Sequence, residues 1–356
     1  MKILFAALKY DYGIKARGES LEYKAFYPAF KCNAEFLVPF WLEDNGFPND
    51  LISMQSKLLQ FAREENPNIV FFMLMENELF PETLLKLKNN YLTINWFCDD
   101  AWRFNNYTKH IAEYFTYSIT VDKYSILKYH EFGFSNVILS QWAAFDYVEN
   151  IDFSKIDYKY EVSFIGSKNP TREWTINYLK SHNINVECFG SGWKNGKVSY
   201  EIMKDIFLYS KINLNLSNSV SNDVRYIKYL TIKLFLTFLQ IPLKHPLKSI
   251  RNLKFYISSF KYFIFSKKRV ETIKARNFEI PGCGGFQLSQ FALEIEDYYR
   301  IGKEISIFSN IEELKKQIDY YLLFQEEREQ IRNSGYLRTN QQTYDKRINK
   351  ILQSLI

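Results

Sequence analysis

YEVSFIGSKNPTREWTINYLK, residues 160–180, is the stretch that decides the fold. Its first residues are mostly apolar and predict a buried β-strand at Tyr160–Ile165. Gly166-Ser167 then forms a turn of small residues, and a helix is expected over about Thr171–Lys180. A strand that leads through a short turn into a helix is half of a βαβ unit, so this stretch predicts a parallel sheet.

The same alternation runs outward in both directions. Before this stretch we expect strands at Lys2–Leu8, Ile69–Leu74, Leu92–Phe97, Ser118–Val121 and Val137–Leu139, and helices at Leu51–Arg63 and Pro81–Leu87. After it we expect strands at Asn185–Phe189, Lys211–Leu216, Gly285–Leu288 and Ile305–Phe308, and helices near Ala275–Pro281, Ile311–Leu323 and Tyr344–Leu355. The chain therefore reads as an α/β protein with two successive doubly wound halves, joined through the aperiodic stretch Tyr147–Tyr160.

Length and composition agree with two globular domains. The chain has 356 residues, of which 47% are hydrophobic and 24% charged. Its four cysteines form no CxxC pair, which excludes a zinc ribbon and suits a reducing cytoplasm. The first residues, MKILFAALKYDYG, lack a signal-peptide cleavage site, and no uncharged run reaches the ~18 residues of a spanning helix. We therefore expect a soluble cytoplasmic protein.

A basic block within the second half needs its own explanation. Val224–Val270 holds 11 Lys or Arg and no Asp or Glu, so the remainder carries 35 basic against 40 acidic residues. The block is also rich in Phe, Tyr, Leu and Ile. Helices of this kind can lie in an anionic membrane interface, or pack on their own domain with the lysines solvated. A polyanionic acceptor such as nucleic acid is the third interpretation, but no base-reading motif supports it.

Three strand-end motifs are candidates for a ligand site. At Gly166-Ser167, the amides of the following helix N-terminus, together with Arg172, would favour a phosphate. In Phe189-Gly190-Ser191-Gly192-Trp193, followed by a helix start at Ser199-Tyr200-Glu201, two glycines would let the backbone approach a flat ligand. A simple structural turn is the alternative at both places. The sequence has no GxGxxG or Walker pattern, which argues against a nicotinamide dehydrogenase or a P-loop NTPase.

The third motif, Lys274–Gly285, reads KARNFEIPGCGG. Its Lys274 and Arg276 could clamp a diphosphate, and Glu279 could bind the hydroxyls of a ribose. A surface ion pair between these charges is the alternative. No histidine lies near Cys283 in the sequence, so we expect that thiol to be a buried small residue rather than a nucleophile.

Taken in order, these motifs resemble the CgeB-type (spore-maturation-like) family of GT-B glycosyltransferases, most clearly over residues 161–346. The resemblance rests on Phe164–Ser167, Phe189–Trp193, Val198–Glu201, Ile212–Ser217, Lys274–Pro281, Gly302–Ile305 and Tyr344-x-x-Arg347. In the first half it rests on Gly18-x-Ser20-x-Glu22-Tyr23 and Asn95–Phe104.

The resemblance implies a GT-B fold, with two Rossmann-like domains facing a cleft. The expected divisions are residues 1–155 for the acceptor-side domain, 156–335 for the nucleotide-sugar-binding domain with its insert at 220–270, and 336–356 for a helix that packs back on the first domain. It also implies transfer of a sugar from a nucleotide-diphosphate sugar to a carbohydrate-type acceptor, without a metal or other cofactor. The donor-binding residues implied are Gly166, Ser167, Arg172, Gly190, Gly192, Trp193, Tyr200, Ser217, Asn218, Lys274, Arg276, Phe278, Glu279, Gly284 and Gly285.

The catalytic residues are expected among carboxylates. Asp99 and Asp100 follow a predicted strand end, and Glu22 is the second candidate for a general base. Glu271 lies eight residues before Glu279, a spacing found in many retaining GT-B enzymes, although the glycine-rich context of that first glutamate is absent here. A non-catalytic surface or spore-coat component of the same fold is the alternative function, as is a glycosyltransferase acting on a polyanionic acceptor.

Overall fold

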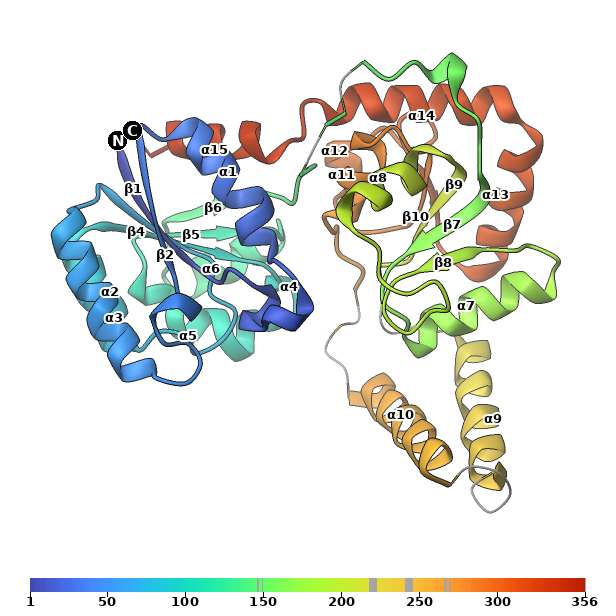
Figure 1. Ribbon diagram of the computed structural model, residues 1–356, viewed down its shortest axis with the longest axis horizontal. Helices are drawn as coiled ribbons and strands as arrows, with labels where there is room; N and C mark the ends of the chain where they lie inside the picture. The colour runs from blue at the N-terminus through green and yellow to red at the C-terminus, as the bar shows by residue number, and fades with distance from the viewer. Residues whose placement is uncertain are drawn as a thin grey trace. The chain divides into compact units, whose positions relative to one another are not determined.

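Two parallel sheets, one in each half of the chain, organise the structure (Figure 1). The computed structural model describes residues 1–145, 147–148, 150–217, 223–240, 246–265, 268 and 270–355. The chain divides into unit 1, Met1–Phe145 with Gln341–Ile356, and unit 2, Asp146–Asn340. The predicted α/β class with two Rossmann-like halves is confirmed.

Unit 1 has six parallel strands in the order β2-β1-β3-β4-β5-β6. Their bounds are β1 Lys2–Ala7, β2 Phe36–Trp41, β3 Ile69–Phe72, β4 Leu92–Phe97, β5 Tyr117–Thr120 and β6 Val137–Leu139. The helices are α1 Tyr27–Asn33, α2 Leu51–Glu65, α3 Pro81–Asn90, α4 Asp100–Arg103, α5 Lys109–Ile111, α6 Ser125–Glu131 and α15 Tyr344–Gln353. Aromatic rings fill the core, as where Phe5 stacks on Phe71 with centroids 5.4 Å apart.

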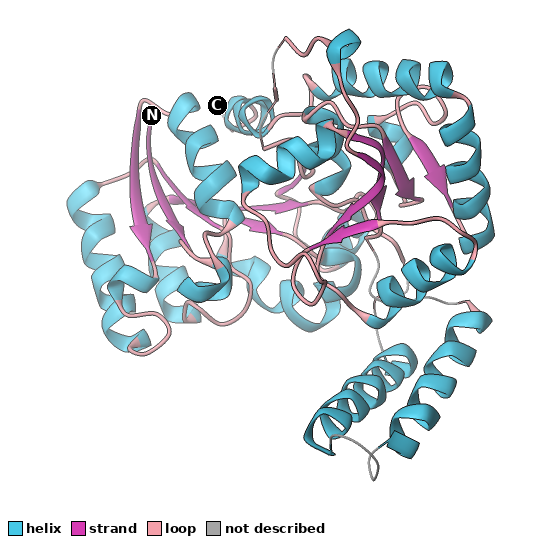
Figure 2. Cartoon of the chain, turned by 45° about the vertical axis from the view of Figure 1, so that its right-hand side comes forward, coloured by secondary structure: helices cyan, strands magenta, loops and turns pink. Residues whose placement is uncertain are grey.

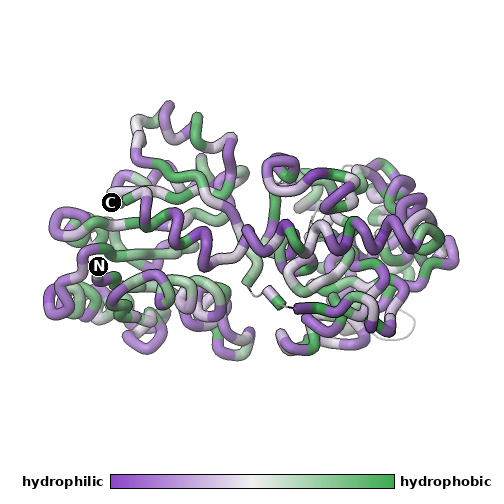
Figure 3. The backbone as a smooth tube through the Cα atoms, turned by 90° about the horizontal axis from the view of Figure 1, so that it is seen from above, coloured by the Kyte–Doolittle hydropathy of each residue, from purple (hydrophilic) through white to green (hydrophobic). Residues whose placement is uncertain are grey.

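Unit 2 has five strands in the order β11-β10-β9-β7-β8. They are β7 Tyr160–Ile165, β8 Glu187–Phe189, β9 Ser210–Asn215, β10 Gln287–Gln290 and β11 Ser306–Phe308. The helices are α7 Pro170–Ser181, α8 Tyr200–Leu208, α9 Val224–Gln240, α10 Pro246–Phe265, α11 Arg276–Gly282, α12 Ile295–Tyr298, α13 Ile311–Leu323 and α14 Gln325–Thr339. Helices cover both sheets (Figure 2), with polar and apolar residues alternating along them (Figure 3).

The unit boundaries lie at 145/146 and 340/341, where the sequence predicted 155/156 and 335/336. The predicted linker belongs to unit 2 because its aromatic residues pack there: Tyr147 stacks on Tyr336 with ring centroids 4.6 Å apart. The last helix, α15, lies in unit 1, where Tyr344 packs 4.7 Å from Phe26. Asn33 donates a 2.7 Å hydrogen bond to Asp345 there.

Candidate functional site: the carboxyl edges of the two sheets

The β7–α7 turn (Gly166–Asn169) and the loop that follows β8 (Gly190–Ser199, here called the β8 loop) lie against each other at the carboxyl edge of the unit 2 sheet. Trp193 donates a 2.8 Å hydrogen bond from Nε1 to the Gly166 carbonyl. Gly190 has φ +122°, and a Cβ there would lie 2.4 Å from that same carbonyl oxygen. A Cβ on Gly192 would lie 2.9 Å from Cβ of Lys168. The glycines of the β8 loop are thus required by close packing of two loops, a simpler reason than the predicted approach to a flat ligand.

Arg172 is fixed in the first turn of α7. Asn169 caps this helix by accepting the Arg172 backbone N–H at 2.9 Å. The guanidinium donates to the carbonyl of Ser167 at 2.7 Å and to that of Leu216, just beyond β9, at 2.9 Å. Two neighbouring strand ends, β7 and β9, are therefore joined by one cation.

A second arginine lies close to the first. Burial and then the positive charge of Arg276 lower the pKa of Arg172 to about 10, while Glu271 acts in the opposite direction. Glu271 is held by a 2.8 Å hydrogen bond from the Ser217 hydroxyl. Arg172, Ser217, Glu271 and Arg276, which the sequence assigned to one site from three separate segments, thus come together at this edge of the sheet.

Arg276 begins α11 and pairs with Glu279 in the same helix. The ion pair is 2.8 Å long, and the carboxylate is more buried than the guanidinium. The guanidinium also contacts the Met203 sulfur and lies 5.1 Å from the centroid of Phe207. Lys274 precedes the helix, and its backbone N–H donates to Asn277 at 3.0 Å. The ion pair that the sequence left as an alternative is therefore formed.

Three predicted donor residues have packing roles. Phe278 is fully buried against Tyr298 and Tyr299. A Cβ on Gly284 would lie 2.5 Å from the Ile151 side chain, and one on Gly285 2.7 Å from Asn213. These contacts explain the residue types without a ligand. Tyr200 begins α8 next to its cap, Ser199, and Asn218 lies outside the described residues.

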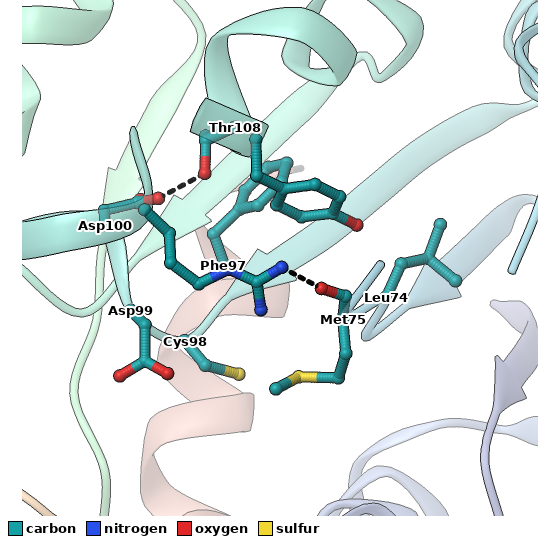
Figure 4. Close-up of a pocket in the computed structure, with 9 residues that line it drawn as sticks. Leu74, Met75, Phe97, Cys98, Asp99, Asp100 and Thr108 are labelled. Atoms are coloured by element: carbon teal, nitrogen blue, oxygen red, sulfur yellow. Dashed lines mark hydrogen bonds between the residues drawn. The ribbon is translucent and has the colours of Figure 1, made fainter. Parts of the chain in front are cut away.

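In unit 1, the two adjacent aspartates have different surroundings. The Asp100 side chain is 1% exposed and accepts hydrogen bonds from Thr108 at 2.6 Å and Tyr129 at 2.8 Å. Burial raises its pKa. We correct the expectation for Asp100, since its carboxylate holds α4 to neighbouring elements. Asp99 is half-buried, and its carboxylate points away from that of Asp100 (Figure 4).

Glu22 is better suited than Asp100 to a proton-transfer role. It lies in a short π-helical turn at Glu22–Phe26, just after Ser20 in the chain. The Ser20 hydroxyl donates a 2.7 Å hydrogen bond to the carbonyl of Leu8, which follows the carboxyl end of β1. Burial raises the pKa of Glu22 to about 7, although hydrogen bonds from its own backbone and Ser20 oppose the shift. A carboxyl group with a pKa near neutrality is suited to accept a proton at pH 7.

The sequence missed the role of Arg103, although it lies in a quoted motif. Arg103 donates a short hydrogen bond to the carbonyl of Met75, which is drawn as a dashed line at Met75 in Figure 4. Its guanidinium lies 4.5 Å from the Tyr107 ring centroid. Glu78 holds the same loop by accepting the backbone N–H groups of Met75 and Glu76 at 3.0 and 2.8 Å. Together with Asp99, Arg103 and Tyr107 line a small pocket. The sequence signal that could have identified this role is an arginine close in sequence to Asp99, the aspartate that follows β4.

The described part of the chain shows neither a metal-binding cluster nor a membrane-spanning helix. Over the described ranges, no group of three or more His, Cys, Asp or Glu side chains is placed to hold a metal ion. Among the described helices, none combines the length and apolar character needed to cross a membrane.

Comparison with known proteins places this geometry in context. Residues 248–353, which include Glu271, Arg276 and Glu279, match a family model described as glycosyl transferase-like. No curated protein matches the sequence. Among solved structures, the Anabaena protein Alr3699/HepE in complex with UDP is similar at 11% identity and a TM-score of 0.53, over 100% of this chain and 99% of that one.

Two further structures are similar at comparable identity. The lipopolysaccharide outer core galactosyltransferase WaaB has 9% identity and a TM-score of 0.58, over 100% of both chains. A glycosyltransferase from Rickettsia africae has 10% identity and a TM-score of 0.55, over 99% of this chain and 97% of that one. Neither the family model nor these three structures is described as a CgeB-type protein. The chain therefore has the GT-B fold, and its segment 248–353 matches a glycosyl transferase-like family model; together these findings support glycosyltransferase activity.

Proposed function

We propose that this glycosyltransferase takes its sugar from a nucleoside-diphosphate sugar held by unit 2, with a UDP-sugar as the first donor to test. The observation that carries the proposal is the pair of neighbouring guanidiniums, Arg172 and Arg276, at the carboxyl edge of a parallel sheet. In open α/β sheets ligands bind at this edge. Two adjacent cations destabilise each other, and a diphosphate between them would remove that cost.

Different residues of unit 2 would bind the diphosphate, the ribose and the base of the donor. Arg172 and Arg276, assisted by Lys274 and the Gly166-Ser167 turn, would neutralise the diphosphate. Glu279 would exchange part of its ion pair with Arg276 for the ribose hydroxyls. Trp193 and Tyr200 would border the base. Positive charge held at the leaving group is the form of electrostatic stabilisation that departure of a nucleoside diphosphate requires. We therefore propose transfer without an obligatory metal.

We propose Glu22 as the general base of an inverting transfer, with Asp99 as the alternative. The pKa of about 7 supports the first choice. In a retaining transfer Glu271, held by Ser217 among the proposed donor residues, would be the candidate carboxylate. The anomeric configuration of the product distinguishes the two cases.

The acceptor would be a carbohydrate. The basic, aromatic segment 224–270 suits a lipid-linked glycan at the cytoplasmic face of a membrane, with the enzyme attached peripherally. We continue to expect no nucleic acid partner. The family-model match favours an enzyme over a non-catalytic coat component.

Thermal shift of the full chain with UDP, GDP, ADP and CMP, each with and without EDTA, tests the donor proposal. Stabilisation by one diphosphate in EDTA is expected. Product mass spectrometry with the matching sugar nucleotides then identifies the transferred sugar. A folded sample that responds to none of the nucleotides would favour the non-catalytic alternative.

A further inference from the structure

Helices α9 and α10 form a hairpin within unit 2, here called the α9–α10 hairpin. Figures 1 and 2 show the two helices side by side, extending from the end of the unit that carries α7. The sequence predicted helices in this basic block, and α9 and α10 are the helices formed. The two faces of the hairpin differ in burial and composition, and this difference indicates its role.

The inner face attaches the hairpin to its own unit. Tyr226 and Leu230 of α9 and Tyr256 of α10 are buried in one cluster with Trp174 and Ile311. The hydroxyls of Tyr229 and Tyr256 both donate to Glu173 Oε2 at 3.0 Å. Packing and hydrogen bonds at the base therefore hold both helices against α7.

The outer face carries large apolar side chains in solvent. On α9, Lys228, Ile232, Phe235 and Leu239 follow one another at helical spacing on the face opposite the buried cluster, and all four are exposed. Phe235 and Phe238 are 63% and 64% exposed, and Leu236 is exposed beside them. On α10, exposed large apolar residues among those described are Ile250, Phe255, Ile257, Ile264 and Phe265. Apolar surface concentrated in this way marks an interaction site.

Charge identifies the partner. Val224–Val270 holds 11 basic residues and no acidic one, and Lys228, Lys254 and Lys261 are exposed. A second copy of the hairpin would bring like charges together. A nucleic acid would match the charge, but would leave the phenylalanine and leucine side chains without an apolar environment. An anionic bilayer satisfies both features, because its headgroups attract the lysines and its acyl boundary receives the apolar side chains.

We propose that the α9–α10 hairpin docks on an anionic lipid bilayer, with Phe235, Leu236, Phe238 and Leu239 inserted at the level of the headgroups and the lysines among the lipid phosphates. The hairpin would lie in the interface without crossing it. This inference names the partner surface of the proposed glycosyltransferase and gives physical content to its peripheral attachment. Vesicle binding needs no donor, so its failure is distinguishable from failure of the proposed activity.

Co-sedimentation of the full chain with vesicles tests the proposal. The vesicles contain phosphatidylcholine alone, or phosphatidylcholine with about 30 mol % phosphatidylglycerol, at low salt and at ~0.5 M salt, where surface charges are screened. We expect binding to the anionic vesicles, weakened by salt, and little binding to the neutral ones. Phe235→Ser with Phe238→Ser should lower binding at least tenfold, and reversing Lys228, Lys254 and Lys261 to Glu should lower it by about fivefold or more for each charge.

Matched controls come from exposed residues of α13 in the same unit. Leu323→Ser and Lys316→Glu should leave vesicle binding unchanged. Equal binding to both vesicle types, no binding, or equal losses in the control variants would overturn the proposal. A salt-sensitive complex with single-stranded RNA, or a dimer that depends on Phe235 and Phe238, formed in place of vesicle binding, would assign the surface to that partner and overturn it equally.

Discussion

At the scale of single residues, a few charged side chains of unit 2 have unusual surroundings. Burial and then the positive charge of Arg276 lower the pKa of Arg172, and both guanidiniums are tied to neighbouring groups by hydrogen bonds or an ion pair. Such an arrangement costs folding free energy that a bound anion would return. Perturbed charges gathered at a strand-end edge are typical of functional sites.

Replacing Arg276 by alanine should weaken donor binding by about tenfold to a hundredfold, because a charge-assisted hydrogen bond contributes roughly 1.5–3 kcal/mol. Titration calorimetry with UDP measures this loss. Arg300→Ala is the control, since Arg300 is exposed and its ion-pair partner, Glu304, is not a proposed donor residue. Normal UDP affinity in a folded Arg276→Ala protein would remove this residue from the donor site.

Glu22 gives a prediction with two readouts. Its pKa in the folded protein, about 7, lies above the ordinary value of 4.5, so the folded state binds more protons between these values. Stability should therefore fall as pH rises from about 4.5 to 7. Glu22→Gln should remove this penalty and stabilise the protein at pH 8 by an amount on the order of 2 kcal/mol. If Glu22 is the base, the variant should also lose transfer activity.

Denaturant unfolding at pH 5 and pH 8 measures the stability difference, and wild-type turnover should rise with pH through about 7. Glu19→Gln, at an exposed neighbouring position, is the control. A more stable Glu22→Gln protein with unchanged turnover would make Glu22 a buried structural acid and leave the base to Asp99.

At the scale of elements, Glu173 joins the α9–α10 hairpin to the β8 loop, which carries the proposed donor residue Trp193. Its Oε2 receives the two tyrosine hydroxyls, and its Oε1 pairs with Lys168 at 3.0 Å. Burial alone would raise the pKa of Glu173, but Lys168 and the tyrosine hydroxyls outweigh it and hold the pKa below its usual value. Lys168 also lies 5.4 Å from the Trp193 ring centroid, so this carboxylate connects α7, the hairpin and the β8 loop.

Glu173→Gln should loosen the hairpin, because a neutral amide accepts the hydroxyls of Tyr229 and Tyr256 more weakly than the carboxylate does. Hydrogen exchange should become faster in Val224–Gln240 and Pro246–Phe265, with little change in the unit 1 sheet. In the wild type, this contribution to stability should be lost as pH falls through the lowered pKa of Glu173. Glu326→Gln, exposed on α14, is the control. Unchanged exchange in both helices would show that apolar packing alone holds the hairpin.

The elements that sequence reasoning missed have identifiable reasons. The strand β2, FLVPFW, contains Pro39, which argues against a central strand, and β2 is indeed an edge strand. The helix α14 lacks an apolar stripe because its buried face carries Arg328 and Arg332, both paired with Glu329. The strands that were predicted are apolar runs between turn residues, a pattern that needs no tertiary knowledge. Asp99 and Asp100 could not be separated from sequence, since only packing shows which one is buried.

At the scale of the whole molecule, each unit contributes a different part of the proposed chemistry. The donor candidates Arg172, Arg276 and Glu279 belong to unit 2, and the base candidates Glu22 and Asp99 belong to unit 1. The donor candidates Arg276 and Glu279 lie within residues 248–353, the segment that matches a glycosyl transferase-like family model. A fold alone does not specify a donor, so the proposed nucleoside-diphosphate sugar depends on the charged residues of unit 2.

The most direct test of that claim is a crystal structure of the full chain with UDP, grown in EDTA. We predict diphosphate oxygens at about 3 Å from the guanidiniums of Arg172 and Arg276, with the ribose hydroxyls on Glu279. UDP bound with its phosphates away from both arginines, or bound only when a divalent metal is supplied, would contradict the account.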